Sequence, residues 1–403
     1  MIHFDLEAFI ARHVTGRQES MFAADMAAAS AQLSDAVRDR SVLVIGGAGS
    51  IGSSFIKALL PFRPDRLVVV DTNENGLTEL TRDLRSTEGL PMPPVYRTYP
   101  MDFGDPVFRK LWRWQGPFDI VANFAAHKHV RSEKDRYSIE AMLGNNVFKA
   151  GRLLEELAQR PPAHFFCVST DKAANPVNVM GASKKLMEEL IRSYADRLPI
   201  TTARFANVAF SNGSLPAGFL ERLMKRQPLS APADVLRYFV SPRESGQICL
   251  LACLAGRSGE IFFPRLAQGE MKTFASIATA LLETLGLEPW PCASEEEARR
   301  RMQEAPRNGK WPVYFFNSDT SGEKPYEEFF TAEETVDLDR FRALGVIRAS
   351  PPLPSAVLQA ALGRLEGLFE ESDLDKAAII GALSEVVPGF RHLETGRSLD
   401  NRM

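Results

Sequence analysis

The sequence predicts an α/β fold in which helices cover both faces of a doubly wound parallel sheet, with a smaller C-terminal lobe. Apolar runs without polar alternation, such as SVLVI at 41–45 and RLVVVD at 66–71, are typical of strands buried on both faces. A helix-length amphipathic segment follows each of these runs. Strands that alternate with helices favour a parallel sheet, and right-handed crossovers then make it doubly wound.

The expected elements alternate regularly up to about residue 208 and become shorter and less regular beyond it. Two helical stretches, 355–372 and 373–387, lie near the end of the sequence. Strands are expected at 41–45, 66–71, 94–100, 117–126, 163–170 and 199–208. Further helices are expected within 20–40 and at 50–62, 73–87, 139–159 and 178–198.

This pattern divides the chain into four expected parts. A helical lead-in covers 1–38, and the sheet domain covers 39–208. A substrate-binding lobe is expected at 209–345, although segments near 236–265 should complete the sheet domain, and a helical tail covers 346–403.

Composition and charge exclude several classes of protein. The 403 residues carry a formal net charge of −3, so nothing favours binding to nucleic acid or to an anionic membrane. No apolar run reaches the ~18–20 residues of a membrane span, and the charged N-terminus is unlike a signal peptide. The four cysteines have no metal-ligand spacing, so we expect a soluble cytoplasmic protein with reduced, buried thiols.

A glycine-rich loop follows the first expected strand. Gly46, Gly49 and Gly52 have the GxxGxxG spacing of a dinucleotide-binding turn, with a strand before it and a helix after it. The N–H groups and positive dipole end of that helix are suited to a pyrophosphate. The loop residues expected to contact the cofactor are Gly46, Gly49, Ser50, Ile51 and Gly52.

An acidic residue ends the second expected strand. Asp71 is placed to accept hydrogen bonds from a ribose diol, which favours NAD over NADP because a carboxylate repels a 2′-phosphate. The residues at 72–75 supply no arginine for such a phosphate. Asp102 is placed to bind the adenine, although a loop or helix-capping role explains it equally well.

The segment 170–184 follows the expected strand at 163–170, at an edge where open α/β sheets bind ligands. Short-chain dehydrogenases/reductases, which this pattern resembles, carry a tyrosine and a lysine four residues apart on one helix face there. Lys184 is present, but Met180 replaces the tyrosine and has no proton to give. Asp171 and Lys172 are the expected substitutes for proton transfer; the alternative is a solvated surface loop.

The sequence STDKAANPVNVMGASK at 169–184 resembles the signature of the CapD-like UDP-N-acetylglucosamine 4,6-dehydratases of polysaccharide biosynthesis. Many members of that family also carry methionine at the tyrosine position. NFAAHKHV at 123–130, RFANVAFSNGSLP at 204–216 and SGEKPYEEFF at 321–330 agree with the same family. The resemblance extends over about 14–392 and implies an extended short-chain dehydrogenase/reductase with a Rossmann domain.

The resemblance also implies roles for individual residues. Thr170, Asp171 and Lys172 would act on the substrate, with Met180 at the tyrosine position. The residues implied to bind NAD are Lys184 and Ala125, and those implied to bind a nucleotide sugar, most simply a UDP-sugar, are Lys128, Asn207, Ser214, Arg237 and Lys324. His127 and His129 flank Lys128, but no third ligand is apparent, so no metal is expected.

The sequence departs from the family pattern at several positions. Ile45 and Ala206 replace a threonine and a glycine, and the arginine and proline expected before GEK fall at Thr320 and Ser321. These departures leave the nucleotide and the sugar open. The resemblance further implies a homo-oligomer, a dimer or larger, because related enzymes pair the helices at 141–158 and 178–197.

The implied reaction has three steps. Hydride passes from sugar C4 to NAD⁺, water is eliminated across C5 and C6, and the hydride returns to C6. Lys172 would remove the C5 proton while protonated Asp171 helps to expel the C6 hydroxyl. We therefore expect the pKa of Lys172 to lie well below the ~10.4 of a free lysine. An epimerase, another reductase on this scaffold and a non-catalytic NAD-sensing protein remain alternatives.

Overall fold

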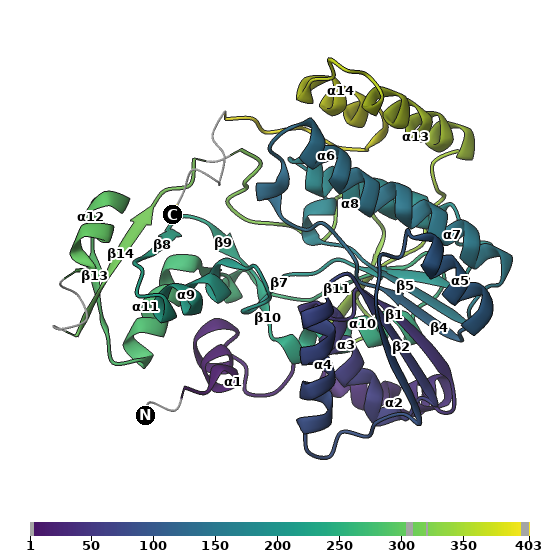
Figure 1. The fold of residues 1–403 in the computed structure, drawn as a ribbon, viewed down its shortest axis with the longest axis horizontal. Coiled ribbons are helices and arrows are strands. Elements are labelled where there is room, and N and C mark those ends of the chain that lie inside the picture. The colour runs from purple at the N-terminus through teal and green to yellow at the C-terminus, as the bar shows by residue number, and fades with distance from the viewer. Residues whose placement is uncertain (1–3, 304–308, 320, 396–402) are drawn as a thin grey trace.

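The computed structural model describes residues 4–303, 309–319, 321–395 and 403. The chain forms a large lobe around a nine-stranded sheet and a small lobe around a three-stranded sheet. The two lobes lie side by side in Figure 1, with the small lobe at the left. Among the described residues, no helix combines the length and the apolar character needed to cross a bilayer.

The large sheet confirms the predicted α/β class. Its order is β15-β16-β11-β6-β5-β4-β1-β2-β3, and the strands from β11 to β3 are parallel. The connections change direction at β1, which lies between β2 and β4, and open α/β sheets bind ligands at such a point. The strands are β1 (Ser41–Ile45), β2 (Arg66–Asp71), β3 (Val95–Pro100), β4 (Ile120–Asn123), β5 (His164–Val168), β6 (Ile200–Ala203), β11 (Ile261–Pro264), β15 (Val336–Asp337) and β16 (Leu344–Ile347).

Helices cover both faces of this sheet because the strands carry apolar residues on both sides. Buried residues of one face pack against α2 (Ala23–Val37), α3 (Ser50–Leu59), α4 (Glu74–Ser86) and α10 (Pro242–Ala255). Those of the other face pack against α5 (Pro106–Gln115), α6 (Arg136–Leu143), the π-helix η4 (Gly144–Lys149), α7 (Ala150–Gln159) and α8 (Val179–Arg192).

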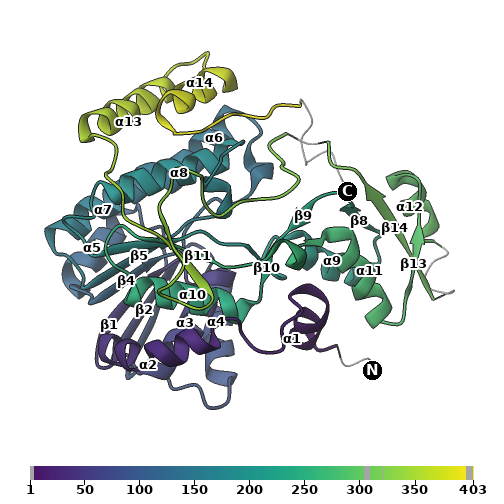
Figure 2. The ribbon, with the colours of Figure 1, turned by 180° about the vertical axis from the view of Figure 1, so that it is seen from behind.

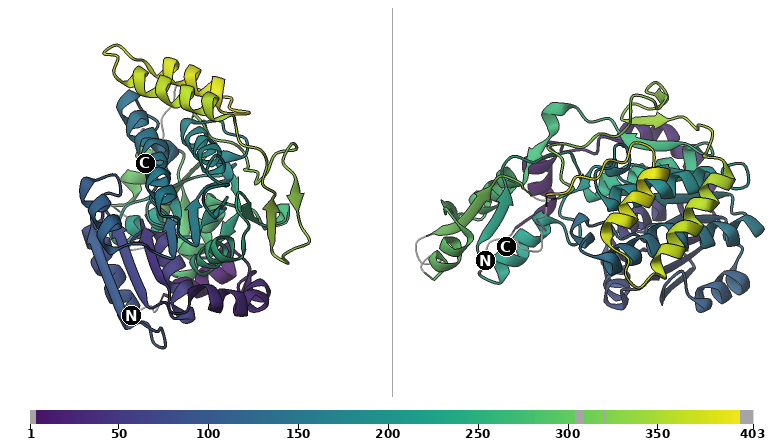
Figure 3. Two further views of the ribbon diagram at one scale, coloured as in Figure 1. Left: turned by 90° about the vertical axis from the view of Figure 1, so that its right-hand side faces the viewer. Right: turned by 90° about the horizontal axis from the view of Figure 1, so that it is seen from above.

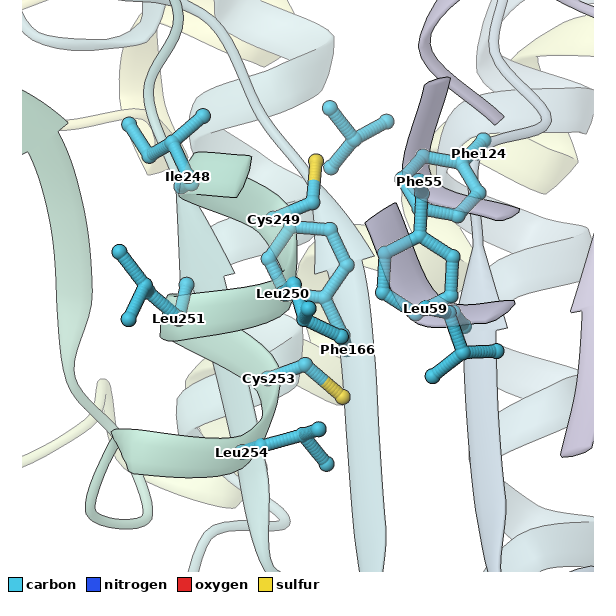
Figure 4. Packing of buried hydrophobic residues seen from close by; sticks show 14 of the residues in the cluster. Phe55, Leu59, Phe124, Phe166, Ile248, Cys249, Leu250, Leu251, Cys253 and Leu254 are labelled. Carbon is cyan, nitrogen blue, oxygen red and sulfur yellow. The ribbon is translucent and has the colours of Figure 1, made fainter. Parts of the chain in front are cut away.

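Helices α3 and α10 cross closely on the first face. A Cβ atom on Gly246 would lie 2.1 Å from the Ser54 carbonyl oxygen, so only glycine permits this approach. Cys249 and Cys253 of α10 lie near Phe55 of α3 in the packed layer of Figure 4. All four cysteines are free and buried, as predicted.

The small lobe contains a parallel sheet in the order β13-β14-β8. Its core includes Phe219, Ile277 and Leu281, and it also receives Phe9 and Val14 from the N-terminal segment. The elements of this lobe and of the segment packed on it are α1 (Leu6–Phe9), η1 (Ile10–Val14), α9 (Leu215–Met224), β8 (Leu229–Pro232), α11 (Phe274–Thr284), β13 (Glu288–Pro291), α12 (Glu295–Arg301) and β14 (Lys310–Phe316). The short pairs between the lobes are β7 (Asn207–Val208) with β10 (Phe239–Val240) and β9 (Leu236–Arg237) with β12 (Lys272–Thr273).

Two segments pack on a different lobe of the molecule from the one expected from the sequence. Residues 336–345 were expected in the substrate lobe and 346–347 in the tail, but β15 and β16 extend the large sheet by antiparallel pairing. The lead-in is divided between the lobes, because η1 packs on the small lobe whereas α2 packs on α10, as seen from behind in Figure 2.

The C-terminal helices are not a separate tail. Helices α13 (Ser355–Phe369) and α14 (Lys376–Val386) form a hairpin that lies over α6 and α8 (Figure 3). Leu358, Leu365, Ile379 and Leu383 of this hairpin are buried in the same core as α8. Together with the other segments that pack on α8, the hairpin leaves every residue of that helix buried.

Candidate active site

Two adjoining cavities open along the carboxyl ends of the parallel strands. The larger, about 1080 Å³, lies beyond β1, β2 and β4, and the smaller, about 300 Å³, lies beyond β5. Phe124 and Ala126 line both cavities, so a ligand in one can meet a ligand in the other. The larger volume lies slightly above the usual range of ~300–1,000 Å³ for small-molecule and cofactor sites, so the larger cavity has room for a dinucleotide.

The glycine loop borders the larger cavity through Gly46 and Gly49. Gly46 has a φ of +73°, and a Cβ atom there would lie 2.5 Å from the Ala125 backbone nitrogen. A Cβ atom on Gly52 would lie 2.4 Å from the Gly46 carbonyl oxygen. The tight turn brings the start of α3 to the cavity edge, and no side chain caps that helix. Its first N–H groups can therefore receive an anionic group.

Asp71 lines the larger cavity and also supports the glycine loop. Its carboxylate accepts hydrogen bonds from the backbone N–H groups of Ala48 and Asn73, both at 2.9 Å. Each carboxylate oxygen can accept more than one hydrogen bond, so Asp71 can still bind a ribose hydroxyl. The predicted binding position is thus also a structural one.

Asp102 lines the same cavity and forms an ion pair with Lys149, at the end of η4. Partial burial by itself would raise the pKa of Asp102, but hydrogen bonds from Lys149 and from the Gly104 N–H hold this pKa below its usual value. π-helical turns are frequent at functional sites, and this one turns Asn145, Phe148 and Lys149 toward the cavity.

The C-terminal hairpin closes part of the larger cavity. Glu366 and Phe369 of α13, and Glu370, the residue after the helix, line the wall. The Phe369 ring meets the Phe148 ring edge-on, with 6.3 Å between centroids. Arg136 donates hydrogen bonds to the carbonyl oxygens of Phe369, Glu371 and Ser372, which fixes the end of α13 against α6.

The smaller cavity brings together Thr170, Asp171, Lys172, Met180 and Lys184. Asp171 is only 3% exposed, and its Oδ1 atom accepts hydrogen bonds from the Thr170 hydroxyl at 2.9 Å and from Lys172 Nζ at 3.0 Å. The loop at 170–173 is therefore a buried, ordered turn rather than a solvated surface loop. Met180 is buried and supplies an apolar wall.

The pKa of Lys172 is not lowered, contrary to the expectation from the sequence. Burial does lower this pKa, but the charges of Asp171 and Glu327 outweigh burial, and the pKa of Lys172 is raised. Glu327 Oε1 lies 3.6 Å from Lys172 Nζ. The sequence expectation considered only burial and neighbouring positive charge, and it omitted this second carboxylate.

Lys184 is buried beneath the same cavity. Its Nζ atom donates a hydrogen bond to the Val168 carbonyl oxygen at 3.1 Å, and burial lowers its pKa. This bond holds the ammonium group of Lys184, which lies in α8, at the end of β5, where it lines the smaller cavity. Its implied contact with a nicotinamide ribose stays a prediction.

The residues implied to bind substrate separate into two groups. Lys128, Asn207 and Ser214 line the smaller cavity, and Lys128 Nζ donates to the Asn212 carbonyl oxygen at 3.0 Å. Arg237 and Lys324 do not line it. Arg237 donates a hydrogen bond to the Lys324 carbonyl oxygen at 3.0 Å, and Lys324 Nζ lies 3.6 Å from Glu327 Oε2.

His127 lines the larger cavity, and His129 lines the smaller one. Thr320, where the family arginine was expected, lies outside the described residues. In the described part of the chain, His127 and His129 belong to no cluster of three or more side chains suited to a metal.

The sequence relationship agrees with this geometry. The model of the family described as "Polysaccharide biosynthesis protein" matches residues 42–348. The chain belongs to this family. An uncharacterized membrane protein of Methanocaldococcus jannaschii is 31% identical over 322 residues, which covers 78% of this chain and 87% of the relative. The probable polysaccharide biosynthesis protein EpsC of Bacillus subtilis is 27% identical over 71% of this chain, and this match covers 48% of EpsC.

The chain therefore spans about half the length of EpsC. It is 27% identical to CapD of Staphylococcus aureus, and this match covers 43% of CapD. Solved structures share the fold of this chain. Pen from Bacillus thuringiensis superposes with a TM-score of 0.62 at 20% identity, covering 79% of this chain and 91% of Pen. The dTDP-glucose 4,6-dehydratase of Bacillus anthracis superposes with a TM-score of 0.52 at 17% identity, covering 73% and 88%.

Several residues that support the site were not singled out from the sequence of this family member. Asn146 bonds to the backbone N–H and carbonyl of His127 and to the Ser183 hydroxyl, so it fastens the loop after β4 to α8. Glu133 accepts a 2.6 Å hydrogen bond from the Val179 N–H at the start of α8. Glu133 was missed because its partner Val179 is distant in the chain, and Glu327, although it lies in the segment 321–330, was missed because its contact with Lys172 is long-range.

Proposed function

We propose that the protein is an NAD-dependent 4,6-dehydratase of a nucleotide-activated sugar, such as UDP-N-acetylglucosamine. The observation that carries this proposal is the pair of buried Asp171 and half-buried Lys172, whose 3.0 Å hydrogen bond lies in a cavity next to a dinucleotide-sized one. An acid and a base in contact, beside an apolar Met180, suit proton transfer without a tyrosine. Two curated relatives are named for polysaccharide biosynthesis, which agrees with a nucleotide-activated sugar as the substrate.

The larger cavity fits NAD. The uncapped start of α3 suits the pyrophosphate, Asp71 suits the adenosine ribose, and Asp102 with Lys149 borders the adenine end. Bound NAD⁺ would supply a reversible hydride acceptor next to the smaller cavity. The dTDP-glucose 4,6-dehydratase of similar fold was solved in complex with NAD.

The Asp171–Lys172 pair can supply both protonation states that elimination requires. Transfer of one proton across its hydrogen bond converts an ammonium and a carboxylate into an amine and a carboxylic acid. Lys172 then takes the C5 proton of the 4-keto sugar, and Asp171 gives its proton to the departing C6 hydroxyl. The step ends with the pair in its ionic form, which agrees with the raised pKa of Lys172 in the resting protein.

The test is incubation with a panel of UDP-, GDP- and dTDP-sugars and analysis of the products by mass spectrometry. We expect a product lighter by one water from at least one amino or neutral hexose. Loss of activity in Lys172→Met, with cofactor binding retained, would assign the elimination to the pair. A panel that yields no dehydrated product contradicts the proposal.

An epimerase is the second candidate, because curated relatives include a UDP-glucose 4-epimerase of Rickettsia felis, 27% identical over 75% of this chain. Epimerisation at C4 needs no acid and base directed at C5 and C6. Its product has the mass of the substrate, so the same experiment separates the two reactions.

A further inference from the structure

Glu327 is a buried carboxylate that lies against the catalytic pair and had no role assigned from the sequence. Its side chain is 3% exposed. Oε1 lies 3.6 Å from Lys172 Nζ and 4.0 Å from Arg237 Nη2, and Oε2 lies 3.6 Å from Lys324 Nζ. Oε2 has no hydrogen-bond partner among the described residues.

Burial of a carboxylate is costly unless cations or hydrogen bonds compensate it. Three cationic side chains within 4.0 Å compensate the charge of Glu327, and one of them is Lys172 of the pair proposed to transfer protons.

We propose that Glu327 is a positioning residue for the elimination step: it orients Lys172 and stabilises the ammonium that forms as Lys172 takes the C5 proton. This inference rests on the dehydratase function proposed above. Glu327 does not line the smaller cavity, so it acts through Lys172 rather than on the sugar.

The charge balance of the step explains why a second carboxylate is needed. The Lys172 lone pair forms the new N–H bond, the C5–H electron pair becomes the C5–C6 double bond, and the C6–O bond breaks. The hydroxyl leaves as water with the proton of Asp171. Asp171 is neutral until that proton departs, so it cannot stabilise the ammonium early in the step. Glu327 is a countercharge that neither gives nor takes a proton in the reaction.

Glu328 provides a matched control for this inference. It is the next residue, it is exposed, and it accepts a 2.8 Å hydrogen bond from the Asn175 side chain. Glu327→Gln and Glu328→Gln therefore remove one carboxylate each from the same loop, but only the first contacts Lys172. Glu327→Asp keeps the charge at a shorter reach.

The experiment measures three quantities with a sugar that the wild-type enzyme dehydrates: water loss, transient absorbance at 340 nm, and the pH dependence of kcat/KM. For Glu327→Gln we expect water loss to fall roughly 10- to 100-fold, somewhat less than for a proton-transferring group. The NADH transient should persist longer because C4 oxidation is intact. The alkaline limb of the pH profile, where the Asp171–Lys172 pair loses its proton, should shift to lower pH. The reason is that the negative charge of Glu327 no longer helps to raise the pKa of Lys172.

Glu327→Asp should recover part of the rate, and Glu328→Gln should match wild type. Equal turnover in both glutamine variants would overturn the inference. So would a Glu327→Gln enzyme in which C4 oxidation and water loss fall together with an unmoved pH profile, since that result indicates a structural role only. A wild-type enzyme that removes no water from any sugar contradicts the proposed function itself.

Discussion

The larger cavity is built mainly from segments that follow one another in the sequence, whereas the chemistry of the smaller cavity depends on segments far apart in it. The loops after β1, β2 and β4 and the π-helix η4 supply most of the larger wall. In the smaller cavity, Asp171 and Lys172 are adjacent, but the charge beside Lys172 comes from Glu327. Motifs thus identify the residues that line a cavity better than the residues that set the electrostatic environment of those side chains.

The largest expected effect is at the smaller cavity. Lys172→Met removes the base and should lower turnover by roughly 100- to 10,000-fold, the usual contribution of a general acid–base group. NADH affinity should be retained, because Lys172 does not line the larger cavity. Met180→Leu is the control: this near-isosteric apolar change should cost less than about 1.5 kcal/mol of stability and keep most activity. Steady-state rates and NADH titrations on both variants check this, and near-normal water loss in Lys172→Met refutes it.

The smaller cavity also rests on a buried ion cluster. Glu188 of α8 binds Arg204 at 2.7 Å and accepts a 2.6 Å hydrogen bond from Ser169. Burial by itself would raise the pKa of Glu188, but Arg204 holds it at about 2. Because this folded-state pKa lies below the ordinary value of 4.5, the cluster stabilises the fold above that pH, and its contribution is lost as pH falls toward about 2.

Glu188→Gln should therefore lower the free energy of unfolding by about 3 kcal/mol at neutral pH, since it leaves a buried arginine partly unpaired. The difference from wild type should shrink as pH falls through the acidic range. Urea unfolding of both proteins across that range measures it. A difference in unfolding free energy that stays constant with pH would show that the pKa of Glu188 is the same in the folded and the unfolded protein.

A moderate effect is expected at the larger cavity from Asp71→Ala. This change removes both the proposed ribose contact and the support that Asp71 gives to the Ala48 and Asn73 N–H groups. NADH affinity should fall about 10-fold or more, in line with ~1.5–3 kcal/mol for a charged hydrogen bond, and the preference over NADPH should narrow. The exposed Glu74→Ala is the control in fluorescence titrations. Wild-type protein that binds NADPH as tightly as NADH would contradict the role of Asp71.

The smallest expected effect tests whether a distant segment also shapes the larger cavity. Phe369→Ala removes an edge-on aromatic contact with Phe148 and part of the cavity wall. Such a pair contributes about 0.5–1.5 kcal/mol, so NADH affinity should fall several-fold. Val357→Ala on the same helix is exposed and does not line the cavity, and it should leave affinity unchanged. Equal NADH affinities of Phe369→Ala and wild type would show that the C-terminal hairpin does not contribute to cofactor binding.

Much of the fold could be predicted because the strands have an unmistakable apolar pattern and the glycine spacing has one physical use. Gly46 and Asp71 were predictable because each follows or ends a strand in a local motif, and their conformations and contacts agree with that motif. Residues 336–347 could not be assigned, because antiparallel pairing to β11 is a long-range choice that short strands do not encode. The raised pKa of Lys172 likewise depends on the fold of the 321–327 loop.

The most direct test of the central claim compares product with cofactor. The protein is incubated with a large excess of UDP-N-acetylglucosamine, or the best sugar of the panel, over NAD⁺, while product mass and absorbance at 340 nm are followed together. The account predicts many equivalents of a product lighter by one water, with no steady accumulation of NADH, because the hydride is returned. Stoichiometric NADH with an oxidised sugar, or an isomer of unchanged mass, would contradict it.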